Sequence, residues 1–170
     1  NEPFMHELVS TLAEQMGSAF PELLSQKALI QRVSAASVTV AGATVGEIER
    51  GLLVFLGLDK SDTQAVAQKL LNKILRYRIF NDAAGHMNLD VGQVGGRLLI
   101  VSQFTLAADT QKGLRPSFSS AMPPADAEVL FEFFVREAAL VQPVATGRFG
   151  ADMQVSLTND GPVTFLLSAE

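Results

Sequence analysis

The sequence predicts a single α/β domain with a mostly antiparallel sheet and two main helices. Its 170 residues, of which 48% are hydrophobic and 18% charged, are enough for one well-filled core. The strand-like segments are short and follow one another over tight links, which favours antiparallel pairing. Two longer segments repeat apolar residues at helical spacing instead.

The first strands are expected close together in the chain. They lie at Ala28–Val33, Ser37–Val40, Thr44–Ile48 and Gly51–Gly57, with a turn at Ala41-Gly42. The last of these segments is apolar throughout, which is typical of a strand buried on both faces.

A first helix is predicted from Ser61 onward. Ser61 followed by Gln64 fits a capping box, in which the serine side chain caps the helix N-terminus. The expected apolar stripe, at helical spacing, is Val66, Leu70, Leu71, Ile74 and Tyr77.

The second half alternates turns, strands and a second helix. We expect a turn at 81–85, a flexible loop at 92–96, a buried strand at Arg97–Val101 and a polar loop at 107–122. The second helix opens at Pro123-Pro124, since proline is tolerated in a first helical turn. Its expected core stripe is Ala127, Leu130, Phe131, Phe134 and Ala138, and the final strands are Val141–Ala145, Met153–Leu157 and Pro162–Leu167.

Residues 1–26 differ from the remainder of the chain. They hold four glutamates and no lysine or arginine, whereas residues 27–170 hold 13 basic and 14 acidic groups. Apolar residues recur at helical spacing up to Gly17, so this segment is either an appendage or a helix that docks on a partner subunit. We therefore place the folded domain at 27–170.

Composition excludes several classes of protein. There is no cysteine and there are only two histidines, which removes thiolate nucleophiles and most histidine-centred sites. No apolar run reaches the ~18 residues of a membrane span, and no secretory signal is visible, so we expect a cytoplasmic protein without a membrane partner. The nearly neutral body argues against a long nucleic-acid groove, so DNA is not expected as a partner. A small basic patch that binds one RNA end remains compatible with this charge distribution.

The common catalytic motifs are missing. The sequence has no G-x-S-x-G, H-E-x-x-H or phosphate-loop motif, and the glycines at 92–96 lack the following Lys-Ser/Thr. His86, between Asp82 and Asp90, is a weak metal signal and is better interpreted as a solvated loop histidine. We expect no metal and no cofactor.

Two segments are unusual, although spacing alone favours an ordinary role for each. Ser102 to Leu106 turns polar at the end of a buried strand, where main-chain donors tend to be displayed. Asn159-Asp160-Gly161 is a turn signal, and Pro162 after it is typical of an edge strand.

Taken together with other blocks, these segments closely resemble the D-aminoacyl-tRNA deacylases. The blocks are Ala28–Val33, Arg78–Phe80, Ser102–Leu106, Lys112-Gly113, Arg115–Phe118, Thr146–Met153 and Asn159–Thr164. The likeness runs from Lys27 to about Ser168. It implies a three-layer fold with mixed sheets, and a homodimer whose active sites lie at the subunit interface.

The resemblance also implies an activity: hydrolysis of the ester that joins a D-amino acid, or glycine, to the 3′ end of tRNA. Gly161-Pro162 would be a cis dipeptide that enters the partner's site and leaves no room for an L side chain, with Val163 and Thr164 beside it. Arg32 would hold its carbonyl groups. Excluding the abundant L substrate by steric clash is a sound way to gain specificity.

The catalytic segment implied by the likeness is Ser102, Gln103, Phe104 and Thr105. The N–H groups of Phe104 and Thr105 would stabilise the oxyanion, while a nucleophilic Thr105 or Thr164 is the competing idea, with no visible base to activate it. Candidate contacts to RNA phosphates are Lys112, Arg115 and Arg148.

Three alternatives stay open. Glycine mischarged on tRNA(Ala) is a rival main substrate, since a pocket that excludes L side chains still accepts glycine. A non-catalytic RNA-binding homologue with the same dimeric fold is a second, and a metal-dependent hydrolase is the weakest.

Overall fold

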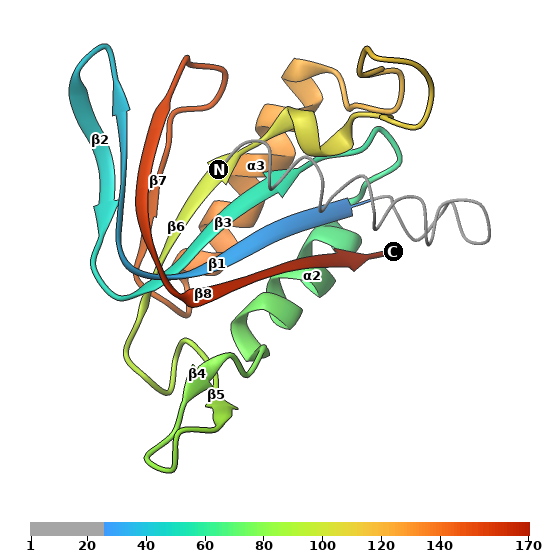
Figure 1. The fold of residues 1–170 in the computed structure, drawn as a ribbon. Coiled ribbons are helices and arrows are strands. Elements are labelled where there is room, and N and C mark those ends of the chain that lie inside the picture. The colour runs from blue at the N-terminus through green and yellow to red at the C-terminus, as the bar shows by residue number, and fades with distance from the viewer. Residues whose placement is uncertain (1–25) are drawn as a thin grey trace.

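A computed structural model describes residues 26–170. Within that range the elements are β1 (Gln26–Val40), β2 (Ala43–Ile48), β3 (Gly51–Gly57), α2 (Gln64–Arg76), β4 (Phe80–Asn81), β5 (Met87–Leu89), β6 (Arg97–Ser102), the 3-10 helix η2 (Phe104–Ala107), α3 (Pro124–Ala139), β7 (Val144–Thr146) and β8 (Gln154–Ala169) (Figure 1). The interpretation of residues 1–25 as an appendage or a docking helix lies outside the described residues.

The main sheet is mixed. Its path is β2-β1-β3-β6-β7, and β8 pairs with β1 off this path. The β3–β6 and β6–β7 pairs are parallel, while β1 pairs antiparallel with β2, β3 and β8. A mixed α/β fold with two helices is therefore confirmed.

The expectation of two separate strands at the start of the domain is wrong, because β1 runs unbroken through both. Its first half, Lys27–Val33, pairs with β3, and its second half, Ala36–Val40, pairs with β2. Strand β8 accompanies it along both halves, with register irregularities around Val33. Such irregularities bend a strand without ending it, so β1 changes partner instead of stopping.

The turn predicted at Asn159-Asp160-Gly161 is also wrong, because β8 continues through it. Thr164 lies opposite Gln31 and Asn159 lies opposite Val33, so a step of five residues on β8 faces a step of two on β1. The excess forms a bulge centred on residues 160–162, which we call the β8 bulge. The Asn159 side chain spans it by accepting a 2.6 Å hydrogen bond from the Val163 N–H.

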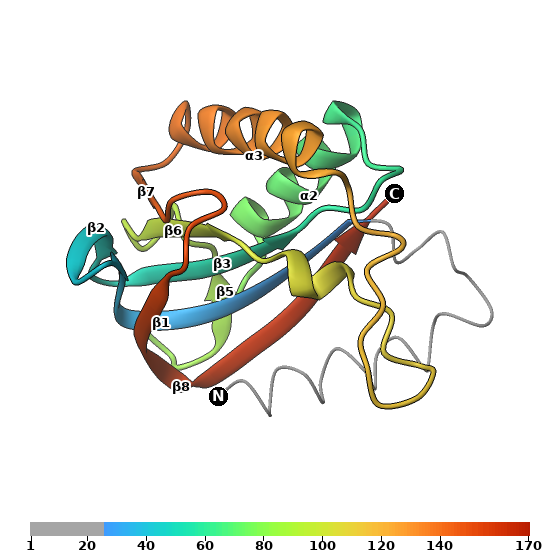
Figure 2. The same cartoon turned by 90° about the horizontal axis from the view of Figure 1, so that it is seen from above.

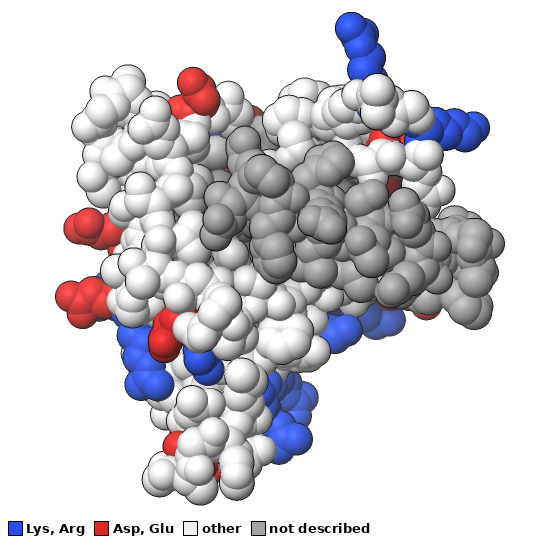
Figure 3. Space-filling view, in the orientation of Figure 1, with Lys and Arg blue, Asp and Glu red and all other residues white. Residues whose placement is uncertain are grey.

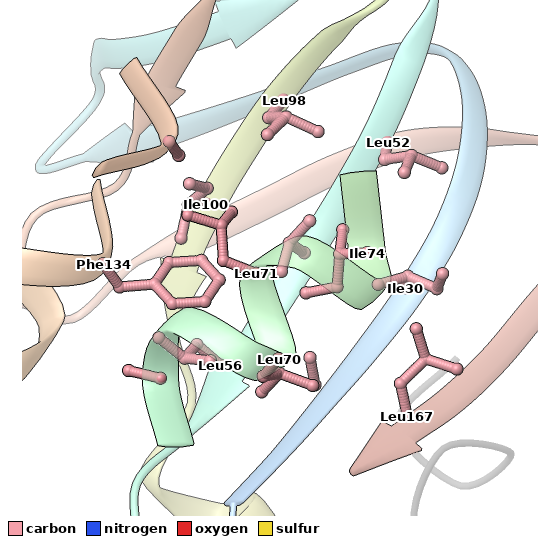
Figure 4. Close-up of a cluster of buried hydrophobic side chains, with 14 of the residues drawn as sticks. Ile30, Leu52, Leu56, Leu70, Leu71, Ile74, Leu98, Ile100, Phe134 and Leu167 are labelled. Atoms are coloured by element: carbon pink, nitrogen blue, oxygen red, sulfur yellow. The ribbon is translucent and has the colours of Figure 1, made fainter. Parts of the chain in front are cut away.

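Buried side chains cover both faces of the central strands. Along β3, Leu52, Val54 and Leu56 face the helices, and Leu53 and Phe55 face a second cluster on the other side. Figure 2 shows both helices on one side of the sheet, and Figure 4 shows the first cluster, where Leu70, Leu71 and Ile74 of α2 meet the strands. The other face packs against residues of β2 and of the first half of β8.

Helix α3 follows its predicted apolar stripe, whereas α2 begins later than expected and follows its stripe only in part. Leu70, Leu71 and Ile74 are buried as predicted, but Ala67 is buried in place of the half-buried Val66, and Tyr77 lies just past the helix end. All five residues of the α3 stripe are buried, as predicted. The N-cap of α2 is Thr63, whose hydroxyl accepts from the Val66 N–H at 3.2 Å, and not Ser61. The Ser61 hydroxyl donates to Asp59 within the preceding turn, and this local bond removes it from capping.

The β4–β5 hairpin explains the acidic group beside His86. Asp82 accepts hydrogen bonds from the Asn88 amide and from the N–H groups of Ala84 and His86. These bonds, the Asn88 bond first among them, hold the pKa of this exposed carboxyl below its usual value. Asp82 therefore closes the hairpin turn, and His86 is exposed in it.

In the described part of the chain, neither α-helix has the length and apolar character that crossing a membrane requires.

Candidate functional site

The first signature segment lies where β6 ends and η2 begins. The Gln103 N–H donates to the Leu56 carbonyl at 2.8 Å, and the Leu106 N–H donates back to Gln103 at 3.1 Å. Among the described residues, the N–H groups of Phe104 and Thr105 have no hydrogen-bond acceptor, as is usual for the first N–H groups of a helix. Two adjacent main-chain donors are thus free to bind a ligand.

Ser102 and Gln103 are half-buried, Phe104 and Thr105 are exposed, and Leu106 is buried. Phe104 is 67% exposed, and its ring lies 5.3 Å from that of Phe118 at an angle of 49°. The Gln103 amide donates to the Thr105 hydroxyl. The close approach of η2 to β3 depends on Gly57, since a Cβ there would lie 2.7 Å from the Leu106 Cβ.

A cavity of about 380 Å³ opens beside these residues. Ser102, Gln103 and Phe104 form part of its wall, and the other lining residues are mostly apolar: Leu56, Leu58, Phe118, Ala121, Met122, Pro123, Pro124, Ala127, Phe149 and Gly150. A second, larger cavity of about 640 Å³ lies at the bend of β1, between Glu47, Arg97 and Ser156. None of the site residues expected from the sequence lines that larger cavity, so the first one is the candidate binding pocket.

The second signature segment is the β8 bulge. The Gly161–Pro162 peptide bond is cis, and Gly161 has φ +142°, a conformation that favours glycine. A Cβ on Gly161 would lie 2.6 Å from Val163 Cγ2 and 3.1 Å from Arg32 Nη2. Val163 is buried, and the Thr164 hydroxyl accepts from the Asn159 and Gln31 amides. The close approach of Val163 and Arg32 to Gly161 on the buried side keeps the exposed backbone of the bulge in place.

Arg32 ties the bulge to the rest of the fold. It is 7% exposed; its Nε donates to the Asp160 carbonyl at 2.9 Å, and its Nη1 donates to the Ile79 carbonyl at 2.8 Å. Its ion pair with the Asp160 carboxylate, at 3.7 Å, adds little because that carboxylate is 58% exposed. The carbonyl that Arg32 contacts belongs to Asp160, one residue before the dipeptide whose carbonyls it was expected to hold.

The two signature segments lie far apart in the sheet, because one follows the end of β6 and the other lies midway along β8. Ser102 pairs with Leu56, which pairs with Ala28, whereas the bulge faces Gln31 to Val33 three strands away from β6. At ~3.3 Å per residue along a strand and ~4.8 Å between strands, their separation is on the order of 20 Å. Figure 1 shows η2 beyond the end of β6 that is remote from the bend of β8. A single chain does not bring the segments together.

The three cations expected to contact RNA all lie on the η2 side. Lys112 and Arg115 are exposed in the loop between η2 and α3, whose base is closed by paired hydrogen bonds between Asp109 and Ser117. Arg148 is exposed next to Phe149, which lines the cavity. Their positions are compatible with a ligand that leaves the cavity toward solvent.

Comparison with known proteins identifies the family. A family model described as D-Tyr-tRNA(Tyr) deacylase matches residues 29–168. A D-aminoacyl-tRNA deacylase of Haemophilus influenzae (strain PittGG) is 63% identical over 141 residues, which cover 83% of this chain and 98% of that protein. One from Saccharophagus degradans is 59% identical over 143 residues, covering 84% and 99%.

The chain belongs to the D-aminoacyl-tRNA deacylase family. It is accordingly an enzyme of the hydrolase class. A solved structure titled "c-Myc DNA Unwinding Element Binding Protein" is 41% identical, with a TM-score of 0.81 over 85% of this chain and 99% of that one. A second, titled as a probable eukaryotic D-amino acid tRNA deacylase, is 16% identical with a TM-score of 0.74 over 84% and 98%, and shows the same fold.

A buried lysine beneath η2 of this deacylase, with a half-buried aspartate near it, was not foreseen from the sequence. Lys27 is 7% exposed, and its Nζ donates to the Leu106 carbonyl at 3.3 Å, at the end of η2. Burial lowers the pKa of Lys27, against the attraction of Asp59, Asp62 and Asp109. Burial also raises the pKa of Asp62 to about 7. Nothing in the sequence marks Lys27 except its place at the head of an apolar strand.

The raised pKa of Asp62 predicts how stability changes with pH. Between about pH 4 and pH 7 the folded state keeps a proton that the unfolded state has lost, so stability falls as pH rises through this window. Asp62→Asn removes that loss. We expect the free energy of unfolding of Asp62→Asn, relative to that of the unaltered protein, to be about 1 kcal/mol higher at pH 7.5 than at pH 4. This is well below the energy of the full pKa shift, because the carboxyl is partly solvated.

Urea denaturation of both proteins at the two pH values measures this difference. The same loss of stability in Asp62→Asn as in the unaltered protein would show that another group titrates.

Proposed function

We propose that this deacylase hydrolyses the ester that joins a D-amino acid or glycine to the 3′-terminal adenosine of tRNA. The observation that carries the proposal is the pair of free N–H groups at Phe104 and its neighbour Thr105, since Phe104 lines a mostly apolar cavity. The names of the relatives support the substrate class. The reaction releases a free amino acid and an intact tRNA.

The cavity suits the terminal adenosine. An exposed aromatic ring provides a stacking surface for a base, and Phe104 supplies one at the mouth, supported by Phe118. With the base on Phe104, the ester carbonyl would lie near the main-chain donors of the same segment. Ser102 and Gln103 shape this wall of the pocket.

The main chain would supply most of the catalysis. Each donor to a developing oxyanion typically lowers the barrier by ~2.7–4 kcal/mol. A nucleophilic Thr105 is less favoured, because its hydroxyl contacts the Gln103 amide, which is no base. The 2′-hydroxyl of the substrate, next to the ester, would assist the attack of water.

A complete site would need two copies of the chain. Since the β8 bulge and η2 are on the order of 20 Å apart in one chain, the bulge would reach the cavity only from a partner. A two-fold dimer would place each bulge in the other copy's site and create two equivalent sites. The exposure of Asp160, Gly161 and Pro162 supports this role.

The β8 bulge would then select the handedness of the substrate. Its main-chain oxygens would face the α-amino group and occupy the space that an L side chain requires, while Arg32 keeps the backbone in position. Glycine has no side chain to exclude, so it would be accepted. Glycyl-tRNA(Ala) is therefore the alternative main substrate within the same mechanism.

The direct experiment follows amino-acid release from D-Tyr-tRNA, L-Tyr-tRNA and Gly-tRNA(Ala) by the purified protein. We expect rapid release of D-Tyr and glycine and at least 100-fold slower release of L-Tyr. Binding of tRNA without release of any amino acid would instead favour the non-catalytic homologue.

Replacing Phe104 by proline tests the main-chain donor. Proline removes the N–H and is tolerated in a first helical turn, and Phe104→Ala is the matched control because it loses the ring but keeps the N–H. We expect kcat of Phe104→Pro to be ~10²–10³-fold below that of Phe104→Ala. Equal rates would refute the role of this N–H.

Thr105→Ala should keep most activity, because its main-chain N–H is retained. A loss of several thousand-fold in kcat would instead support Thr105 as the nucleophile.

Hybrid dimers test whether the site is shared. Phe104→Pro damages the η2 side, and Gly161→Val damages the bulge, where a Cβ already meets Val163. In a heterodimer with one variant in each chain, isolated by two different tags, one of the two sites combines both undamaged halves. We therefore expect about half of the activity of the unaltered protein, whereas either homodimer should have almost none. Activity no higher than that of the homodimers would contradict a shared site.

A further inference from the structure

The outer face of α2 carries a row of cations. Lys69, Lys73 and Arg76 are spaced by four and three residues, so they lie on one side of the helix and are exposed. The buried residues Ala67, Leu70, Leu71 and Ile74 occupy the opposite side. Arg78 is exposed just beyond the helix end. We call these four cations the α2 strip; Figure 3 shows blue side chains in this region of the surface.

The strip is not neutralised by acidic side chains. Residues 63–81 contain these four cations and no aspartate or glutamate. Within the described range, none of the four forms an ion pair with an acidic side chain. Lys69 and Lys73 donate only to main-chain oxygens of Glu170 and Ser168 at the end of β8. In a chain of net charge −5, such a concentration of positive charge is a local exception.

Helix stability explains only part of the strip. Lys73 and Arg76 lie in the last turn of α2, where cations interact favourably with the helix dipole. Lys69 lies before that turn and Arg78 beyond it, so neither benefits to the same degree. Arg136 of α3 also lies in the last turn of its helix and provides a reference for the dipole effect alone.

The strip ends at the β8 bulge. Arg78 is followed by Ile79, whose carbonyl accepts from Arg32, and Arg32 also holds the Asp160 carbonyl. Tyr77, between Arg76 and Arg78, packs its ring edge-on against Phe165 of β8 at 5.6 Å. The cations are thus anchored to the same structure that positions the bulge.

We propose that the α2 strip binds backbone phosphates of the acceptor arm of tRNA. This proposal rests on the proposed function, because the bulge marks the place where the 3′ end enters a shared site. The acceptor arm behind that end is a dense row of phosphates, which an acidic protein binds only through a local basic surface. In each shared site, one copy would contribute the bulge and the α2 strip. The other copy would contribute η2 together with Lys112, Arg115 and Arg148.

Charge removal on the strip tests the proposal in two assays. The strip variant is Lys73→Gln/Arg76→Gln/Arg78→Gln, and the matched single variants are Arg76→Gln and Arg136→Gln, each of which loses one last-turn arginine. The first assay measures Kd for uncharged tRNA at several KCl concentrations. The second measures kcat and KM on D-Tyr-tRNA and on the minimal ester D-tyrosyl-adenosine, which has no acceptor arm.

We expect Arg76→Gln to weaken tRNA binding three- to tenfold and Arg136→Gln to change it less than twofold. The strip variant should lose at least 30-fold, and its plot of log Kd against log salt should flatten by about one unit per lost phosphate contact. Its kinetics on D-tyrosyl-adenosine should be unchanged.

Binding and salt dependence equal to those of Arg136→Gln would overturn the proposal. An equal loss on D-tyrosyl-adenosine would also overturn it, since the strip would then act on the site itself. If the unaltered protein binds tRNA but releases no D-amino acid, the proposed function fails, while the binding assay still decides whether the strip contacts phosphates.

Discussion

The two segments of the candidate site are both held by buried cations of one strand. Among the described residues, the buried charged side chains are Lys27 and Arg32, and both belong to β1. Each donates to a main-chain carbonyl of a functional segment: Lys27 to Leu106 at the end of η2, Arg32 to Asp160 in the β8 bulge. A buried charge is costly unless hydrogen-bonded, so each cation strongly favours the arrangement that satisfies it. Strand β1 thereby fixes both segments and also their separation.

That separation has a consequence for assembly. Main-chain pairing from β6 through β3 and β1 to β8 is continuous, and no side-chain rearrangement shortens a distance set by strand spacing. Under the proposed function, a site that uses both segments would be built between two molecules, and its precision would depend on how rigidly each chain presents its half. The Arg32 bonds to Ile79 and Asp160 and the crowding around Gly161 provide this rigidity on one side. Close packing of Leu106 over Gly57 provides it on the other.

Sequence periodicity predicted the parts of the fold that depend on local pattern. The apolar stripe of α3 and the buried strand β3 follow directly from spacing. Periodicity did not predict strand continuity, which depends on long-range pairing. Strands β1 and β8 are continuous because each is paired along its whole length, and this pairing outweighs the turn signal at Asn159 to Gly161. The contacts of Lys27 and Arg32 lie 79 and 128 residues away in sequence, so no local pattern could reveal them. The signature segments were noticed from their residues, but only the family resemblance assigned them a functional role.

The proposed site, made largely of main-chain atoms, would explain why composition conveyed so little about function. N–H and carbonyl groups are present at every residue, so only their geometry distinguishes a reactive segment from an ordinary strand end. Side chains then act indirectly: glycine permits a close approach, an aromatic ring offers a stacking surface, and a buried arginine fixes a carbonyl. Because main-chain groups carry no net charge, long-range attraction for a polyanion would come from cations around the site, such as Lys112, Arg115 and Arg148, and from others on the surface. Under the proposal, the α2 strip, which is joined to the bulge through Ile79 and Arg32, would add to this attraction.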